Sequence, residues 1–415
     1  MNIFLFIILA ALLLEFALDI VSNSLNLRAL RSKPPSGLQG IYETEEYRRS
    51  QEYTRTTTRF HFVRTTFNLS LLLGFWFTGG FNYLDGMVRE PNLHVVVTGV
   101  LYIGVLSIFF LLMSLPFSIY STFVIEERFG FNKTTLGTFV GDQMKGLVIS
   151  IVIGAPLLAG IIAIFEYVGS LAWLYSWIVV TLFILVLQFI APTWIMPLFN
   201  KFTPMEAGDL RNAILDYARS VNFTVANIFI IDGSKRSSKA NAFFSGFGRN
   251  KRIALFDTLV EKHTESELVA VLAHEIGHYK KKHILQGMLI SILHTGVLFF
   301  LLSIFLSAGS LYDAFLMERS STYAGILFFM LLYTPIEVVA SIVQHKISRR
   351  HEFDADQWAV ETFDKPQSLI DALKKLSADN LSNLAPHPFF VFLNYTHPTL
   401  LQRAEAIQRH WRNKP

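Results

Sequence analysis

Apolar runs alternate with polar, charged segments along the chain, and this pattern predicts a membrane protein. Seven runs have roughly the 20-residue length that a bilayer demands, and each is rich in Leu, Ile, Phe and Val. The first run carries Glu15 and Asp19, which indicates a retained membrane helix whose two acids face protein or water. We expect membrane-spanning helices at 3–22, 60–81, 95–116, 146–168, 170–196, 284–309 and 322–345.

Basic residues gather in alternate loops between the predicted spans. Lys and Arg number seven in 23–59 and three in 117–145, but one each in 82–94 and 310–321 and none in 165–169. Since positively charged loops stay in the cytoplasm, the N-terminus is expected outside and both long polar segments are expected in the cytoplasm. A bacterial inner membrane and the endoplasmic reticulum both fit this orientation.

The predicted fold class is a mostly helical membrane protein with a small β hairpin or sheet in its cytoplasmic part. A short buried strand is expected at 227–232, and strands at 241–247 and 251–256 form a hairpin with a Gly-rich turn. The chain then divides into spans one to five (1–196), a cytoplasmic domain (197–283), spans six and seven (284–345) and a cytoplasmic tail (346–415).

Composition narrows the classes of function. Only 16% of the residues are charged, against roughly 25% in soluble domains, which agrees with the membrane assignment. The net charge of +4 is too small to indicate nucleic acid as a partner. Cysteine is absent, so any metal must be held by His, Asp or Glu.

One predicted helix carries metal-binding chemistry. Thr264 and Glu267 form a capping box that opens a helix through LVAVLAHEIGHYKKKH. His274 and His278 project from one face of that helix, so both imidazoles can reach a single Zn²⁺. Glu275 lies beside the first ligand, where it can take a proton from an activated water.

A zinc site of this kind needs a third protein ligand. Glu352 and Asp356 lie four residues apart on one face of the tail helix, and Glu352 is the expected ligand. His278 and Glu352 each stand roughly 10 Å beyond their spans, so continuous helices from spans six and seven would bring them together. Asp356 is expected to accept a hydrogen bond from a ligating imidazole, the alternative being a salt bridge to Arg349 or Arg350.

Two ionisable residues lie inside predicted spans, where charge is expensive. His294 is in the sixth span and Glu337 in the seventh. These two side chains either line a hydrated cavity or form ion pairs, with each other or with Arg64 in the second span. We expect ion pairing rather than a cavity.

Several motifs together resemble the integral membrane zinc metalloproteases of the type I CAAX prenyl protease family. The resemblance runs from the first span to the tail, with departures at Asp354, where the family often has Gln, and at Lys239 and Ala240, where a His-Ser pair is common. The motifs are HEIGH (274–278), SRRHEFDADQWA (348–359), YTHPTLLQR (395–403), IEERFGFNK (125–133) and GSKRSSKANAFFSGFGRNKRIALFDTL.

The resemblance implies one zinc per chain and endopeptidase activity at the C-terminal end of prenylated substrates, at a site that opens into a large chamber between the spans. It implies that His397 stabilises the oxyanion and that Arg403 holds the substrate's terminal carboxylate. The strand around Asn241 and Ala242 would pair with substrate backbone as an added strand. The expected partners are the lipid bilayer and a peptide or prenylated C-terminus, and the chain is expected to be a monomer.

Three other functions compete with this interpretation. A membrane quality-control zinc protease shares HExxH and a downstream Glu, but has fewer spans and less of the motifs at 125–133 and 395–403. A metal transporter would place its ligands inside the spans, whereas these lie just beyond them. An inactive scaffold would usually have lost Glu275, which is intact.

Overall fold

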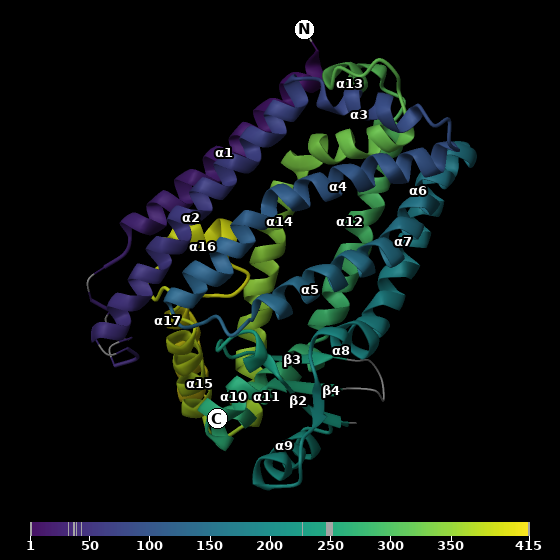
Figure 1. Cartoon of the computed structure of the whole chain (residues 1–415). Helices are drawn as coiled ribbons and strands as arrows, with labels where there is room; N and C mark the ends of the chain where they lie inside the picture. Colours follow the sequence, from purple (N-terminus) through teal and green to yellow (C-terminus); the bar gives the residue numbers. More distant parts are fainter. Residues whose placement is uncertain are drawn as a thin grey trace.

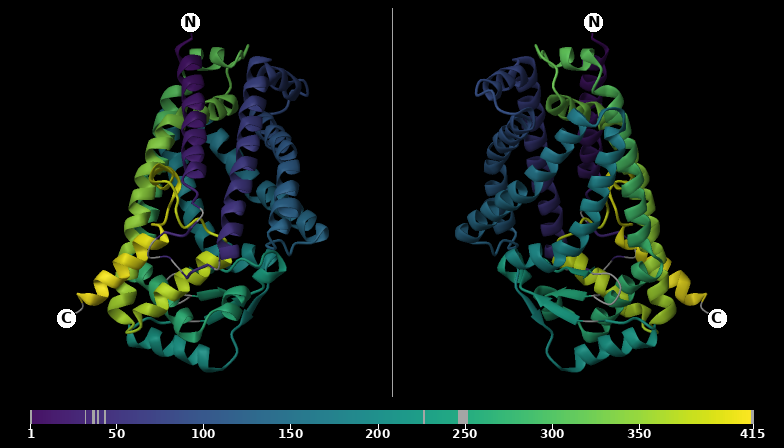
Figure 2. Two further views of the ribbon diagram at one scale, coloured as in Figure 1. Left: turned by 90° about the vertical axis from the view of Figure 1, so that its left-hand side faces the viewer. Right: turned by 90° about the vertical axis from the view of Figure 1, so that its right-hand side faces the viewer.

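The computed structural model describes residues 2–31, 33–35, 38, 40–42, 44–225, 227–245 and 252–413. Long helices form one end of the molecule, and a small sheet with short helices forms the end opposite the N-terminus (Figures 1 and 2). The predicted fold class, a mostly helical membrane protein with a small sheet, is confirmed.

The long helices are interrupted by short π-helical turns. η1 (Ser121–Glu126) extends α4, η2 (Ser150–Gly154) joins α5 to α6, and η4 (Ala191–Ile195) joins α7 to α8. The helices of this region are α1 (Ile3–Arg28), α2 (Thr44–Phe77), α3 (Gly80–Arg89), α4 (Val95–Tyr120), α5 (Leu136–Ile149), α6 (Ala155–Tyr167), α7 (Ala172–Ile190), α8 (Met196–Phe199), α12 (His283–Phe305), α13 (Gly309–Ala314) and α14 (Thr322–Thr362).

Six of the described helical stretches are long and apolar enough to cross a membrane, so the predicted count of seven is wrong. The predicted span at 60–81 is the exception. It covers the end of α2 and the start of α3, and His61, Arg64 and Asn68 dilute its apolar residues. α2 lies beside α1, as Figure 1 shows, and His61 Nε2 is 2.8 Å from Asp19 Oδ2 on α1. The polar side chain of His61 therefore has a partner on the neighbouring helix.

The ionisable residues of spans six and seven pair as expected. His294 Nε2 of α12 lies 3.4 Å from Glu337 Oε2 of α14. Both residues also line a pocket of about 440 Å³ between these helices, which extends to His351 and Thr396. The larger chamber that the family resemblance implied stays a prediction.

The sheet has four strands in the order β1-β2-β4-β3, with β1 at Phe202–Pro204, β2 at Asn227–Ile231, β3 at Ala242–Ser245 and β4 at Arg252–Phe256. β3 and β4 pair antiparallel, as the predicted hairpin requires, although its turn at 246–251 lies outside the described residues. The parallel pairing of β2 with β4 and the presence of β1 were not predicted. β3 forms one edge of this sheet.

Helices pack around this sheet and bury its apolar side chains. Leu268, Leu272 and Ile276 on one face of α11 are at most 2% exposed and contact the core of this region. The remaining helices are α9 (Asp209–Ser220), α10 (Asp257–Lys262), α11 (Glu265–Lys280), α15 (Pro366–Asp379), α16 (Pro388–Asn394) and α17 (Leu400–Arg412). The predicted capping box at Thr264 and Glu267 opens α11.

The two helices that carry the predicted ligands enter this region differently. α14 is one helix of 41 residues, as expected for a span that continues into the tail. The expected continuity of the HExxH helix with span six is wrong, because α11 ends at Lys280 and α12 begins at His283. Lys282 lies between them with φ at 60°, a left-handed conformation that ends one helix and starts another.

Candidate metal centre

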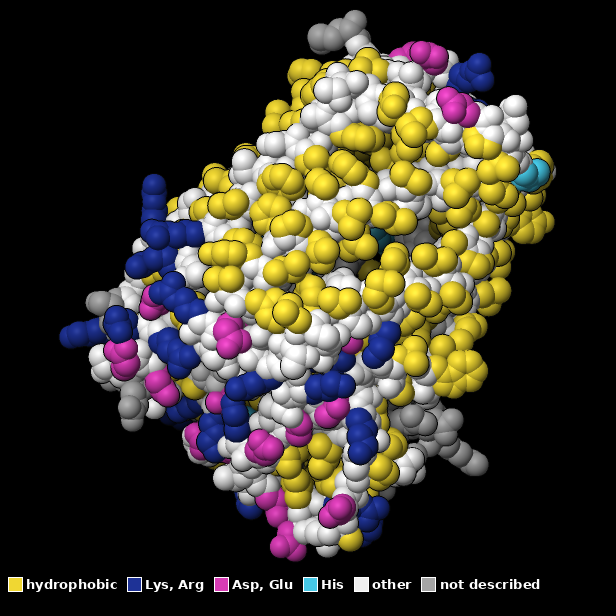
Figure 3. All heavy atoms as spheres, viewed as in Figure 1, with side chains coloured by type: hydrophobic (Ala, Val, Ile, Leu, Met, Phe, Trp, Pro, Cys, Tyr) yellow, Lys and Arg dark blue, Asp and Glu magenta, His cyan; other side chains and the backbone are white. Residues whose placement is uncertain are grey.

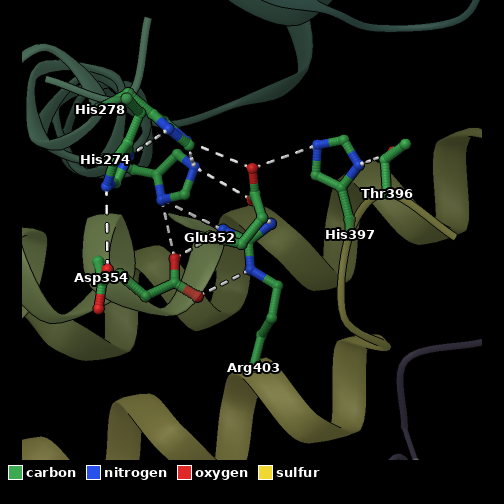
Figure 4. A network of polar contacts seen from close by, with 9 residues as sticks. His274, His278, Glu352, Asp354, Thr396, His397 and Arg403 are labelled. Atoms are coloured by element: carbon green, nitrogen blue, oxygen red, sulfur yellow. Dashed lines mark hydrogen bonds and ion pairs between the residues drawn. The ribbon is translucent and has the colours of Figure 1, made fainter. Parts of the chain in front are cut away.

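Three side chains from two helices, α11 and the C-terminal half of α14, meet at one point. His274 and His278 project from one face of α11, and their Nε2 atoms are 3.1 Å apart. Glu352 of α14 places Oε2 3.4 Å from His274 Nε2 and Oε1 3.3 Å from His278 Nε2 (Figure 4). One ligand atom from each residue lies within 4.8 Å of the other two, which is a geometry that can hold a metal ion.

A glycine allows α11 and α14 to approach this closely. A Cβ atom on Gly277 would lie 3.0 Å from the carbonyl oxygen of Ala355 and 3.1 Å from the Cβ of Trp358. Both neighbours are on α14, within two turns of Glu352. Gly277 therefore sets the separation at which the two imidazoles meet the carboxylate.

Asp356 and Arg403 contact the metal-binding side chains and hold them in place. Asp356 Oδ1 lies 2.8 Å from His274 Nδ1, and Arg403 of α17 donates to both Asp356 oxygens at 2.8 and 2.6 Å. Arg403 Nη1 is also 3.2 Å from Glu352 Oε2. Asp356 is fully buried and Arg403 is 8% exposed, so each buried charge has partners of opposite sign.

These charges affect the imidazole between them. Burial and the charge of Arg403 both lower the pKa of His274, but its hydrogen bonds to Asp356 and Glu352 outweigh them and raise the pKa to about 9. Two carboxylates thus stabilise a positive charge at this position. A metal cation bound there takes the place of that proton, because a ligating imidazole nitrogen must be free of one.

His283 also contacts the centre, although none of the sequence motifs assigns it a role. Its Nδ1 lies 3.0 Å from Nδ1 of His278, and its ring stacks on His351 with centroids 4.0 Å apart. On one continuous helix a residue five positions after His278 lies about 140° round the axis. The break at Lys282 turns His283 back toward the site, and no signal in the spacing gives that break.

The other predicted site residues come from three different parts of the chain. His397 follows α16, and its Nε2 is 3.4 Å from Glu352 Oε1, with the side chain 62% exposed. Glu275 is half-buried on α11 next to His274. Asn241 precedes β3 and accepts a hydrogen bond from Phe256 N–H at 3.2 Å through its carbonyl, while Ala242 pairs with Leu255 of β4.

The sequence matches two family models that together cover most of the chain. Residues 23–201 match the model described as CAAX prenyl protease N-terminal, five membrane helices. Residues 204–410 match peptidase family M48. The chain is therefore an integral membrane metalloprotease, and it belongs to the type I CAAX prenyl protease family, as the motifs indicated.

Similar proteins extend over nearly the whole chain. It is 36% identical to CAAX prenyl protease 1 of Saccharomyces cerevisiae over 406 aligned positions, and the match covers 91% of this chain and 88% of that protein. It is 32% identical to the CAAX prenyl protease 1 homolog of Homo sapiens, over 90% of this chain and 88% of that protein. The crystal structure of S. mikatae Ste24p shares the fold with a TM-score of 0.92 at 34% identity, covering 97% of this chain and 99% of that one.

Proposed function

We propose that the chain is a zinc endopeptidase that cleaves near the C-terminus of prenylated CAAX-type proteins or peptides. The meeting of His274, His278 and Glu352 beside a membrane-spanning helix supports this most directly. A prenyl group anchors such a substrate in the bilayer. α14 runs without a break from the bilayer to Glu352, so the anchored C-terminus and the site lie at the same membrane surface.

Zinc fits the donor set better than other common cations. Two imidazoles and one carboxylate are the ligands of a catalytic zinc site that keeps a fourth position open. The Glu352 carboxylate lies 3.3 and 3.4 Å from the two imidazole Nε2 atoms, so a single cation can contact all three side chains. Calcium and magnesium prefer sites made of oxygen alone. We therefore assign one zinc to each chain.

Glu275 supplies the acid-base chemistry. When bound, Zn²⁺ polarises the scissile carbonyl and lowers the pKa of a water molecule to about 7. Glu275 takes the proton of that water and passes it to the leaving amine, so no covalent intermediate with the protein forms. Its place on α11 directly after His274 holds its carboxylate beside the reacting atoms.

The side chains around the metal ligands take the remaining roles. His397 is exposed above Glu352, and we assign it to the oxyanion of the tetrahedral intermediate. β3, which begins at Ala242 directly after Asn241, has β4 on one side and no other described strand on the other, so it can add a substrate strand. The guanidinium of Arg403 is engaged by Glu352 and Asp356, so we assign it to positioning these carboxylates in place of the terminal-carboxylate role.

Metal analysis with paired peptides tests the proposed activity. Purified chain should contain one zinc and cleave a farnesylated CAAX peptide, while Glu275→Gln should keep the metal and lose about 10²- to 10⁴-fold in rate. Glu261→Gln, an exposed glutamate on α10, is the matched control and should be fully active. Equal rates for Glu275→Gln and the original chain would overturn the mechanism, and equal cleavage of an unprenylated peptide would favour general membrane-protein quality control.

We also propose that the N-terminus faces outside, that the metal centre faces the cytoplasm and that the chain acts as a monomer. The chain has no cysteine, so a single introduced thiol reports its own exposure. In sealed vesicles with their cytoplasmic face inward, an impermeant thiol reagent should label Ser310→Cys, and it should label Arg211→Cys only after permeabilisation. The reverse pattern would overturn the orientation, and a dimeric mass by light scattering would overturn the monomer.

A further inference from the structure

A basic pocket lies where α1 ends and α2 begins, away from the metal centre. Its volume is about 720 Å³, and five of its twelve lining residues are arginines. Figure 3 shows Lys and Arg side chains gathered over this end of α2, below the apolar surface of the long helices. The five are Arg31, Arg48, Arg55, Arg59 and Arg128.

Only part of this positive charge is neutralised. Arg48 pairs with Glu45, and Arg128 pairs with Glu52. The other three arginines have no carboxylate within 4.0 Å among the residues that the structure describes. Five arginines and two glutamates leave the pocket lining with an excess of three positive charges, which attracts an anion.

Buried polar atoms in the lining of the same pocket also lack partners. Tyr47 is 2% exposed and Gln51 is 9% exposed, and both line the pocket. The Tyr47 hydroxyl and both amide atoms of Gln51 have no hydrogen-bond partner in the described part of the chain. Buried donors without partners are costly, and a phosphate oxygen that enters the pocket would accept from them.

The pocket stands at a membrane boundary. Its first lining residue, Leu30, lies two positions after the end of α1, a candidate membrane span. Basic clusters directly beyond a span attract the head groups of anionic lipids. A neighbouring contact ties this region to the protease half, because Tyr42 donates hydrogen bonds to the carbonyls of Ser377 and Ser382.

We propose that this pocket binds a phosphate-bearing anion, with the three unpaired arginines as the charge and Tyr47 and Gln51 as neutral donors. Its place directly after a membrane span identifies a phospholipid head group as the source, rather than a free phosphate compound. The site is separate from the zinc chemistry, so its loss should leave the metal content unchanged.

A titration of the full chain in detergent tests this assignment. Short-chain phosphatidylinositol 4-phosphate should bind and raise the midpoint of thermal unfolding, whereas short-chain phosphatidylcholine should do neither. Arg55→Gln/Arg59→Gln should bind the anionic lipid about 30-fold more weakly, since each arginine near a lipid surface contributes on the order of a 5-fold factor. Arg211→Gln/Arg412→Gln removes two exposed arginines elsewhere and should bind as the original chain does.

Two further measurements complete the test. One distinguishes a lipid head group from a free phosphate compound, and the other uses a variant that is expected to fold normally. Gln51→Leu removes the unpartnered amide without changing charge, and should weaken binding about 5-fold while the unliganded protein unfolds at the same or a higher temperature. Soluble inositol 1,4-bisphosphate that binds as tightly as the lipid would overturn the lipid source and leave a phosphate site. Equal binding by Arg55→Gln/Arg59→Gln, or equal binding of phosphatidylcholine, would overturn the site itself.

Discussion

The two halves of α14 bury different kinds of side chain. In the membrane half, Tyr323, Phe328 and Phe329 are at most 1% exposed and pack against other apolar side chains. In the half beyond the membrane, the buried residues include Glu352 and Asp356, which are held by His274, His278 and Arg403 of other helices. Apolar packing dominates the burial in the first half, whereas the second half also needs each buried charge to be matched.

This difference has a physical cause. Lipid is as apolar as a leucine side chain, so helices in a bilayer associate through close packing and small residues. Beyond the membrane, a buried carboxylate is stable only when opposite charges or a metal offset its lost hydration. Substitutions in the metal-bearing half should therefore affect metal binding and activity, and substitutions in the membrane half should affect stability alone.

The largest effect is expected from Glu352→Gln. It removes the one negatively charged ligand, so zinc content should fall from one per chain to near zero and the hydrolysis rate by more than about 10⁴-fold. Glu361→Gln lies on the same helix but is exposed, and should retain both metal and activity. Zinc retained at full occupancy in Glu352→Gln would contradict the assignment of this ligand.

Asp356→Asn should have the next largest effect. It keeps the side-chain volume but removes the charge that faces His274 and Arg403, and residues that orient a metal ligand typically contribute 10- to 100-fold to affinity or activity. Competition with a zinc chelator measures the affinity. An unchanged zinc affinity would mean that Arg403 and Glu352 alone orient the imidazole.

A pair of glycine substitutions tests the comparison directly. A Cβ on Gly277 meets backbone of α14, which cannot rotate away, so Gly277→Ala should separate α11 from α14 and weaken zinc binding about tenfold. A Cβ on Gly99 meets the side chains of Ile162 and Tyr323 at 2.8 and 2.9 Å. Gly99→Ala should cost about 1–3 kcal/mol in unfolding free energy through overpacking, with zinc content unchanged.

Chelator competition and thermal unfolding, applied to both glycine variants, separate the two outcomes. The comparison between the halves of α14 would fail if Gly99→Ala lost zinc while still folded. It would also fail if Gly277→Ala changed stability but not zinc affinity.

Thr264→Ala should have the smallest effect. It removes the hydroxyl that accepts from the Glu267 N–H at the start of α11, which should cost about 1 kcal/mol of stability. The ligands lie two or more turns further along the helix, so activity per folded molecule should not change. A loss of activity larger than the loss of folded protein would show that the start of α11 positions the metal ligands.

Much of the site could be predicted from the sequence because its signals are local. Length and apolarity identify spans in lipid, where every backbone group must be bonded within the helix. The capping box begins α11 at Glu265, and the four-residue spacing puts His274 and His278 on one face. The absence of cysteine restricts the third ligand to His, Asp or Glu.

Tertiary structure decided the features that depend on contacts between distant segments. The contact between Asp19 of α1 and His61 of α2 pairs two ionisable side chains that lie far apart in the sequence. The break at Lys282 turned His283 toward His278. A charged side chain alone does not specify its partner, because the Coulomb energy depends on distance and burial, and the fold sets both.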